Sequence, residues 1–206
     1  MYVPEPYRAA SLAEQQQLIE RVRMGTLVTA SPGWLASPLP FTLNREQGPF
    51  GTLYTHMDKA NPLWQRLVNE PEVLVTFWGP NSYVSPSWYG TTPRVPTWYY
   101  GAVHVTGTAK LITDAEPLMA ILNDLTEQME GPDSPWHLSQ VSDYADRLVK
   151  HIIGVAVQIG AMDAQIRVGQ GDNAADATAV EQALKSGEPG QQAMASFMQQ
   201  RKESKP

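Results

Sequence analysis

The chain has 206 residues, of which 42% are hydrophobic, and this size predicts one main globular domain. It contains no cysteine, which excludes disulfides, thiolate catalysis and cysteine-ligated metal centres. The formal net charge is −6 and the 15 Lys and Arg residues are dispersed, which argues against direct DNA binding because phosphates require clustered cations.

The beginning of the chain, MYVPEPYRAA, lacks the basic start and the apolar stretch of a secretory signal. No apolar run approaches the roughly 18 residues that a membrane-spanning helix requires. We therefore expect a soluble cytoplasmic protein without a membrane anchor.

The first third of the chain predicts a helix followed by a meander of strands. Ser11 and Glu14 form a capping box that opens a helix over 11–23. Turn-forming SPG and NREQGP separate three short β-prone segments, at 26–30, 35–43 and 51–55. Pro62 then predicts a short helix over 61–68, since proline is tolerated in the first helical turn.

The rest of the chain predicts longer strands and two further helices. Residues 73–78 are continuously apolar and predict a central strand buried on both faces, whereas 102–111 alternates between apolar and polar positions. Helices are expected from Asp114 to the GPDSP turn and through Tyr144, Leu148 and Ile152. A strand is predicted over 152–159, with 164–168 as its short partner.

These elements predict a folded domain followed by a less ordered extension. We expect residues 1–168 to form one domain with a helical insertion at 114–151, and residues 169–206 to form a weakly helical or mobile extension. Several short strands without regular βα alternation predict an α+β fold built on an antiparallel β-barrel rather than a Rossmann sheet. Neither GxGxxG nor GxxxxGK[ST] occurs.

The most unusual stretch, residues 82–104, is rich in Trp, Tyr, Ser and Pro. Large planar side chains and nearby hydroxyls suit a flat heteroaromatic ligand, and prolines preset the loop shape. The same aromatic residues could instead form core and a subunit interface, where Trp and Tyr are also enriched. Composition alone favours the packing interpretation.

A second candidate is the turn after the strand at 51–55. The chain there reads THMDKAN, and Lys59 and His56 precede a helix that begins near Asn61. Free N–H groups at a helix N-terminus and a nearby cation suit a phosphate. Lys59 as an ordinary exposed lysine and His56 as an ordinary polar residue remain the simpler interpretation.

Histidine and serine chemistry receives little support. His104 lies on the polar face of its strand and could contact a ligand, bond within the barrel or bind haem. His137 and His151 lack the spacing of a zinc site, so no metal is expected. Ser85 and Ser87 stand in VSPSWY rather than in GxSxG, so we do not expect a serine nucleophile.

The residues resemble a known family, the PaiB-type FMN-binding negative transcriptional regulators. The resemblance spans about the first 160 positions, through MYVPEPY, FGTLYTHMDKANPLW, FWGPNSYVSPSWY, VPTWYYGAVHVTG and HIIGVAVQI. It implies a split-barrel fold like that of flavin reductases and pyridoxamine-phosphate oxidases, in a homodimer with FMN at the subunit interface. A KLSQN-like block near the end of family members appears here as RVGQGDN, retaining Gln170.

The resemblance implies two sets of cofactor-binding residues. The first follows a strand and is expected near phosphate: Thr55, His56, Lys59 and Asn61. The second is expected near the flavin ring: Ser85, Ser87, Trp88, Tyr89, Thr97 and Trp98, with His104 as a further candidate. No catalytic residue is assigned.

Three functions remain open. The first is an FMN-binding regulator that acts through a partner, because the acidic chain lacks a recognisable helix-turn-helix. The second is a flavin-dependent reductase or oxidase, or a haem-binding barrel with His56 or His104 as the axial ligand. The third is an interaction module whose aromatic loop only forms a dimer interface.

Overall fold

The computed structural model describes residues 1–203, which form two compact units. Unit 1 comprises residues 1–18, 78–103 and the chain from 163 onward, and unit 2 comprises residues 19–77 and 104–162. Three long strands pass from one unit into the other, so each unit combines segments that are distant in the sequence.

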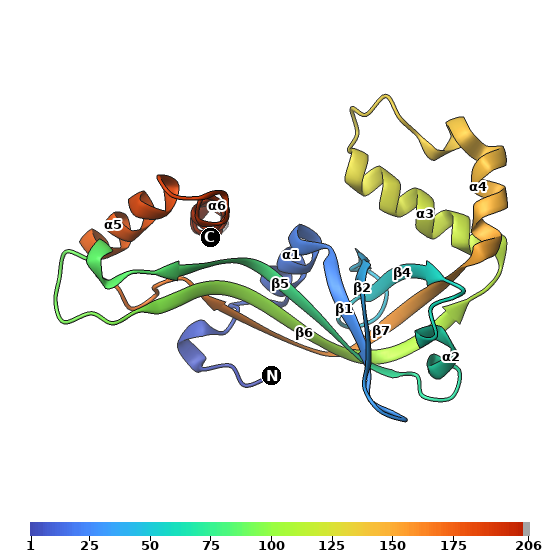
Figure 1. The fold of residues 1–206 in the computed structure, drawn as a ribbon, viewed down its shortest axis with the longest axis horizontal. Coiled ribbons are helices and arrows are strands. Elements are labelled where there is room, and N and C mark those ends of the chain that lie inside the picture. The colour runs from blue at the N-terminus through green and yellow to red at the C-terminus, as the bar shows by residue number, and fades with distance from the viewer. Residues whose placement is uncertain (204–206) are drawn as a thin grey trace. The chain divides into compact units, whose positions relative to one another are not determined.

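Seven strands form one sheet in the order β2-β1-β5-β6-β7-β4-β3 (Figure 1). Their bounds are β1 Met24–Thr29, β2 Leu35–Pro40, β3 Thr42–Asn44, β4 Thr52–Asp58, β5 Glu72–Val84, β6 Thr97–Ile112 and β7 Ile152–Arg167. β1 pairs with β2 and β5, and β4 pairs with β3 and β7, in each case antiparallel. The sheet and its flanking helices confirm the expected α+β class with an antiparallel sheet.

Six α-helices and four short 3-10 helices accompany the sheet in the described part of the chain. The α-helices are α1 Leu12–Val22, α2 Leu63–Leu67, α3 Ala115–Glu130, α4 Ser142–Leu148, α5 Ala174–Lys185 and α6 Pro189–Glu203. The 3-10 helices are η1 Glu5–Tyr7, η2 Pro86–Trp88, η3 Leu138–Val141 and η4 Val149–His151. None of the helices within residues 1–203 combines the length and the apolar character that crossing a membrane requires.

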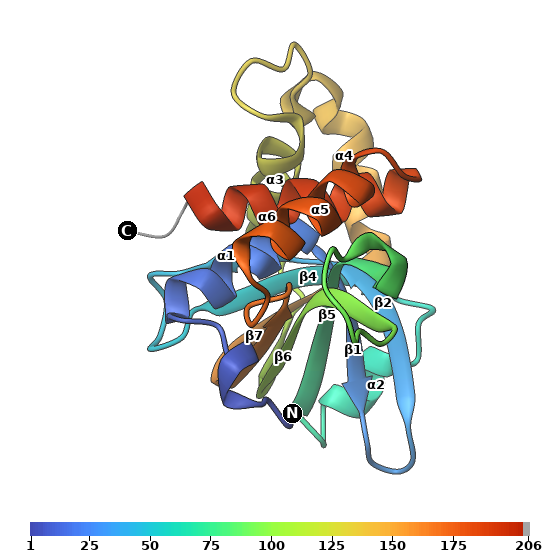
Figure 2. The same cartoon turned by 90° about the vertical axis from the view of Figure 1, so that its left-hand side faces the viewer.

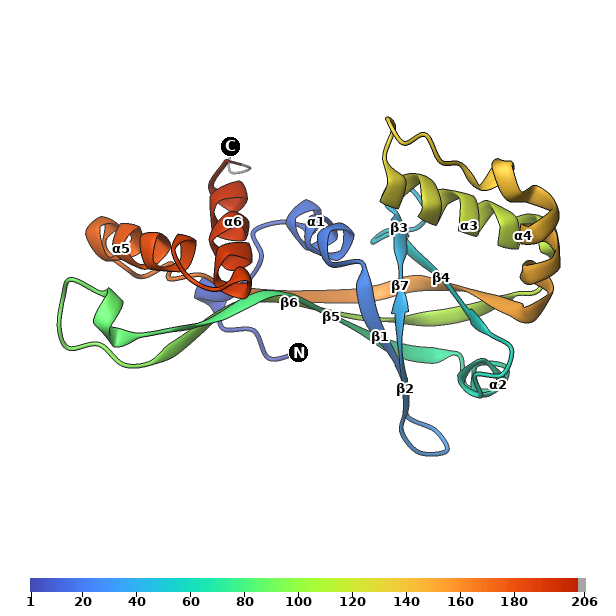
Figure 3. The same cartoon turned by 45° about the horizontal axis from the view of Figure 1, so that its top comes forward.

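The packing of unit 2 involves β5 and α3. Phe41 and Phe77 are fully buried and meet edge to face, with ring centres 5.5 Å apart. α3 contacts β4 (Figure 3). At Gly154 in β7, an added Cβ would lie 2.7 Å from a methyl carbon of Leu118 on α3, so a glycine lets the helix approach the strand closely.

Unit 1 contains the outer halves of β5 and β6, which run side by side, and the C-terminal helices α5 and α6 (Figures 1 and 2). An added Cβ at Gly101 would meet Leu18 of α1 and Phe197 of α6 at 3.1 and 3.2 Å. Met194 on α6 is fully buried, and α5 contacts both α6 and η2. Helices α5 and α6 are therefore packed into the core of this unit, α6 through Met194, Phe197 and Met198, and residues 204–206 lie outside the described residues.

Ion pairs also fasten α6 within unit 1. The Arg201 guanidinium lies 2.6 Å from the Glu14 carboxylate of α1, and both side chains are largely buried. Lys202 pairs with Glu181 of α5, which also accepts from Lys185. These bonds lower the pKa of Glu181, with the larger effect from Lys185 and the smaller from Lys202.

The expected helix over 11–23 is confirmed by α1, and Ser11 Oγ accepts from Glu14 N as in a capping box. The alternation predicted over 102–111 is also confirmed, because Val103 and Val105 are fully buried whereas Thr106 and Thr108 are exposed. Other boundaries differ from the sequence prediction.

The single strand expected over 35–43 is two strands. Residues 35–40 pair with β1 and residues 42–44 pair with β4, and the chain changes partner at Phe41, whose N–H bonds to the Arg23 carbonyl. The two strands expected over 152–168 are instead one strand, β7. The helix expected to reach Ile152 ends at Leu148.

The strand at 73–78 is not buried on both faces. Burial alternates along it, and Trp78 is 60% exposed. The continuous apolar run reflects half-buried positions such as Leu74, which sequence periodicity does not distinguish from buried ones.

Candidate functional site

The aromatic stretch forms a hairpin-like end of β5 and β6 in unit 1. β5 continues to Val84 and β6 begins at Thr97, so the connecting loop is residues 85–96. Ser85 caps η2: its Oγ accepts from the Ser87 amide at 3.2 Å and lies 2.8 Å from Ser87 Oγ. This cap fixes the start of the loop.

Two aromatic pairs line the β5–β6 strands. Tyr83 and Trp98 meet edge to face with ring centres 6.3 Å apart, and Trp78 and Tyr100 lie 6.2 Å apart. Trp98 is 54% exposed, so a large ring surface remains open to a partner molecule. Trp88 is half-buried in η2.

A buried carboxylate holds the loop to α5. Asp176 has no exposed surface, and it accepts from the amides of Gly90 and Thr91, from the Thr91 hydroxyl and from Arg94. The Thr91 hydroxyl bond, reinforced by Arg94 against the opposing effect of burial, lowers the pKa of Asp176 to about 2. The carboxylate is therefore ionised at neutral pH, and it joins α5 to the loop.

Arg94 links this carboxylate to a second one. It bonds to Asp176 and lies 2.9 Å from the Asp172 carboxylate, while its guanidinium carbon stands 4.5 Å from the centre of the Tyr89 ring. The bond to Asp176 raises the pKa of Arg94. Its charge is thus compensated within the protein.

Tyr99 completes the network. Its side chain is almost fully buried, and its hydroxyl donates to Asp172 at 2.7 Å and lies 3.3 Å from the Tyr89 hydroxyl. Burial raises the pKa of Tyr99 well above its usual range. The phenol stays protonated and keeps its donor role.

The second predicted group lies in unit 2, at the end of β4 and the start of α2. Thr55 is buried and donates to the Pro40 carbonyl at 2.6 Å. The Asn61 amide nitrogen donates to Ser37, and its carbonyl oxygen accepts from the Leu63 amide. Lys59 is exposed and donates one of its three ammonium hydrogens to the Lys150 carbonyl, and the other two have no acceptor among residues 1–203.

His56 is the polar group of this turn that is not satisfied. Its Nδ1 is buried and has no hydrogen-bond partner within residues 1–203. Burial lowers the pKa of His56, so the ring is neutral at neutral pH. A neutral ring nitrogen can accept a hydrogen bond or bind a metal.

The predicted residues therefore divide between the units. Six of them lie in unit 1 on or beside the 85–96 loop, namely Ser85, Ser87, Trp88, Tyr89, Thr97 and Trp98. Thr55, His56, Lys59, Asn61 and His104 lie in unit 2, with His104 half-buried in β6. No cluster of three His, Cys, Asp or Glu side chains suited to a metal occurs in the described chain.

Asp172 and Asp176 were missed by sequence reasoning. Asn173 caps α5 by accepting from the Asp176 amide at 2.9 Å, and Asp176 occupies the position of the acidic residue in a capping box. This N-x-x-D spacing predicts the start of a helix. It does not predict that the carboxylate binds a loop more than 80 residues away.

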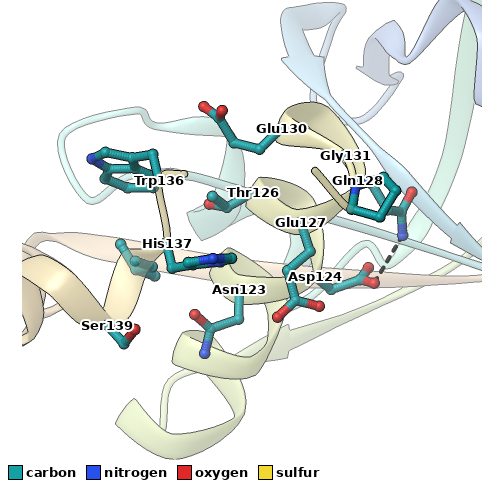
Figure 4. A pocket seen from close by; sticks show the side chains of 12 residues that line it. Asn123, Asp124, Thr126, Glu127, Gln128, Glu130, Gly131, Trp136, His137 and Ser139 are labelled. Carbon is teal, nitrogen blue, oxygen red and sulfur yellow. Dashed lines mark hydrogen bonds between the residues drawn. The ribbon is translucent and has the colours of Figure 1, made fainter. Parts of the chain in front are cut away.

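A separate pocket of about 590 Å³ lies in unit 2 between α3 and the following loop (Figure 4). Asp124, Glu127 and Glu130 line it with Trp136 and His137, and Asp124 accepts from Gln128. It contains none of the predicted cofactor-binding residues.

Comparison with known proteins gives a family and a fold. Residues 1–161 match a family described as "Putative FMN-binding domain". The chain is 28% identical over 202 residues to "Protease synthase and sporulation protein PAI 2" of Bacillus subtilis, and the match covers 97% of each chain.

Two solved structures share the architecture. An FAD and heme binding protein from Mycobacterium smegmatis has a TM-score of 0.61 at 15% identity, covering 84% of this chain and 79% of that one. The flavocytochrome Anf3 from Azotobacter vinelandii has a TM-score of 0.58 at 14% identity, with 79% and 70% covered. At these identities the likeness shows the fold, which is the split barrel expected from the sequence.

Proposed function

This chain belongs to the PaiB-like FMN-binding family, and from that membership we propose that it is a homodimeric split-barrel protein that binds FMN and influences gene expression indirectly. The observation that supports this most is the defined aromatic loop of unit 1. The loop carries hydroxyl groups at Ser85 and Ser87, and β6 begins directly after it with Thr97 and the 54% exposed Trp98.

The residues present fit FMN. The isoalloxazine ring is planar and apolar with a polar rim, so its face suits the exposed Trp98 indole and its rim suits hydroxyl groups such as those of Ser85 and Ser87. A phosphate requires a cation or free N–H donors, and unit 2 by itself offers such a cation, because Lys59 has two ammonium hydrogens without a protein acceptor in the described residues. When bound, FMN would supply redox chemistry that the side chains themselves lack.

FMN binding is tested by titrating flavin-free protein and following the visible absorption and flavin fluorescence. Trp98→Ala should weaken FMN affinity about 3- to 10-fold, since aromatic ring contacts contribute about 0.5–1.5 kcal/mol. Trp34→Ala is the matched control, because Trp34 is 78% exposed and lies outside the loop. Protein that is colourless once excess FMN has been removed by gel filtration, or equal losses in both variants, would refute the proposal.

The indirect mode of regulation rests on charge. The net charge of −6 and the dispersed cations do not suit a phosphate backbone, so we expect no direct DNA binding. A gel-shift titration at low salt tests this, and tight sequence-specific binding would overturn it. Sedimentation of the protein with and without FMN tests the homodimer.

A flavin-dependent reductase or oxidase is the alternative within the same family. The 85–96 loop is then a flavin site whose cofactor exchanges electrons with a substrate. Bleaching of bound FMN by a reduced nicotinamide would favour the enzyme, and FMN that stays oxidised under anaerobic conditions would favour the regulator.

Haem binding is the second alternative, with His56, whose imidazole is held neutral because burial lowers its pKa, as the candidate ligand. A neutral imidazole can serve as an axial ligand, and proteins described as haem-binding share the fold. Haem addition should then give a Soret band that His56→Ala abolishes. A band that survives in this variant and disappears in His104→Ala would assign the other histidine.

A further inference from the structure

Unit 1 contains a pocket of about 400 Å³ at the end of β7, which is within the range of small-molecule sites. One wall is the loop from Gly169 to Asp172, and the other is the segment from Tyr89 to Tyr99. Tyr7 and Arg167 complete it. The family match ends at residue 161, so Arg167 and the glycine loop lie beyond the matched region.

The two arginines in this pocket differ in charge compensation. Arg94 is paired with Asp172 and Asp176. Arg167 has no carboxylate partner in residues 1–203, and its guanidinium carbon lies 5.1 Å from the centre of the Tyr7 ring. The pocket therefore presents one uncompensated cation whose donors remain available.

The chemistry of the walls restricts the ligand. An arginine fork binds a carboxylate in a bidentate manner, which selects for a planar anion. The Tyr7 and Tyr89 rings and Val95 supply apolar surface for a small ring. The Thr97 hydroxyl also lines the pocket and has no hydrogen-bond partner within the described chain.

We propose that this pocket binds a small aromatic carboxylate, with Arg167 binding the carboxylate and the tyrosine rings contacting the ring of the ligand. The site shares Tyr89 and Thr97 with the predicted flavin residues. It goes beyond FMN binding because the cation that defines it and the Gly169–Gly171 wall belong to the RVGQGDN block, which supplies none of those predicted residues.

The test is a titration of flavin-free protein with benzoate, followed by the amide NMR signals of Gly169 and Gly171 and by calorimetry. Benzamide, which has the same ring and no charge, should bind at least tenfold more weakly. Because FMN is absent, the outcome does not depend on the proposed FMN function.

Arg167→Gln should weaken benzoate binding at least tenfold, and Arg167→Lys, which keeps the charge but not the fork, should give an intermediate loss. Arg147→Gln is the matched control: Arg147 also stands over a tyrosine, 5.6 Å from the Tyr144 ring centre, but outside the pocket. Its variant should bind like the wild type. No benzoate binding at 10 mM, equal binding of benzamide, or an unchanged affinity in Arg167→Gln and Arg167→Lys would overturn the proposal.

Discussion

Removing the hydroxyl of Tyr99 tests whether the network between β6 and the C-terminal segment stabilises the protein. Tyr99 is 2% exposed and donates to the Asp172 carboxylate at 2.7 Å, so Tyr99→Phe deletes a hydrogen bond to a charged acceptor while keeping the ring. Such bonds contribute about 1.5–3 kcal/mol. We expect the free energy of unfolding to fall by about 2 kcal/mol, which corresponds to a decrease in Tm of about 4–8 °C for a chain of this size.

The assay is unfolding in guanidinium chloride, followed by fluorescence and circular dichroism, whose transitions must coincide. Tyr83→Phe is the control, because Tyr83 is 41% exposed and its hydroxyl has no partner in the described residues. Its effect should stay within about 0.5 kcal/mol. A double-mutant cycle of Tyr99→Phe with Asp172→Asn should give a coupling energy above about 1 kcal/mol. A coupling near zero, or equal effects of Tyr99→Phe and Tyr83→Phe, would refute the reasoning.

Three further perturbations probe other contacts. Because the pKa of Asp176 is lowered to about 2, its bonds stabilise the fold above about pH 4 and are lost as pH falls through 2. The free energy of unfolding should therefore decrease as pH falls from 4 to 2, and this decrease should be smaller in Asp176→Asn. An equal decrease in the variant would contradict this role of Asp176. Gly107→Ala would place a Cβ 2.3 Å from the Gln158 carbonyl oxygen, so we expect a loss of about 1–3 kcal/mol by thermal unfolding. Gly160→Ala, whose nearest contact is 3.7 Å, should be tolerated, and similar losses in both would argue against the steric cause. Phe77→Ala should cost about 3–5 kcal/mol in denaturant, since the ring is fully buried, and a loss below about 1.5 kcal/mol would contradict this packing.

The family and the fold class could be predicted from the sequence because they depend on local patterns. The turn-forming SPG and NREQGP, the alternation at 102–111 and the long motifs around VSPSWY are continuous in the chain. The capping box at Ser11 likewise predicted the start of α1 to within a residue.

Strand partners were less predictable, since pairing is a long-range property. Nothing near Phe41 indicates that the chain leaves β1 and joins β4 there, and nothing near Gly160 indicates that β7 continues without a turn. Half-burial at Leu74 also depends on what covers each face of the sheet.

What the sequence by itself determined is the chemistry available: an aromatic, hydroxyl-rich loop, an acidic chain without cysteine, and a PaiB-like family pattern. What only the tertiary structure decided is which charges are compensated. Asp172 and Asp176 neutralise Arg94 across more than 70 residues of sequence, whereas Arg167 remains unpaired within the described chain and faces a pocket. Charge compensation depends on distances of a few ångströms between distant segments, and a linear sequence does not contain those distances.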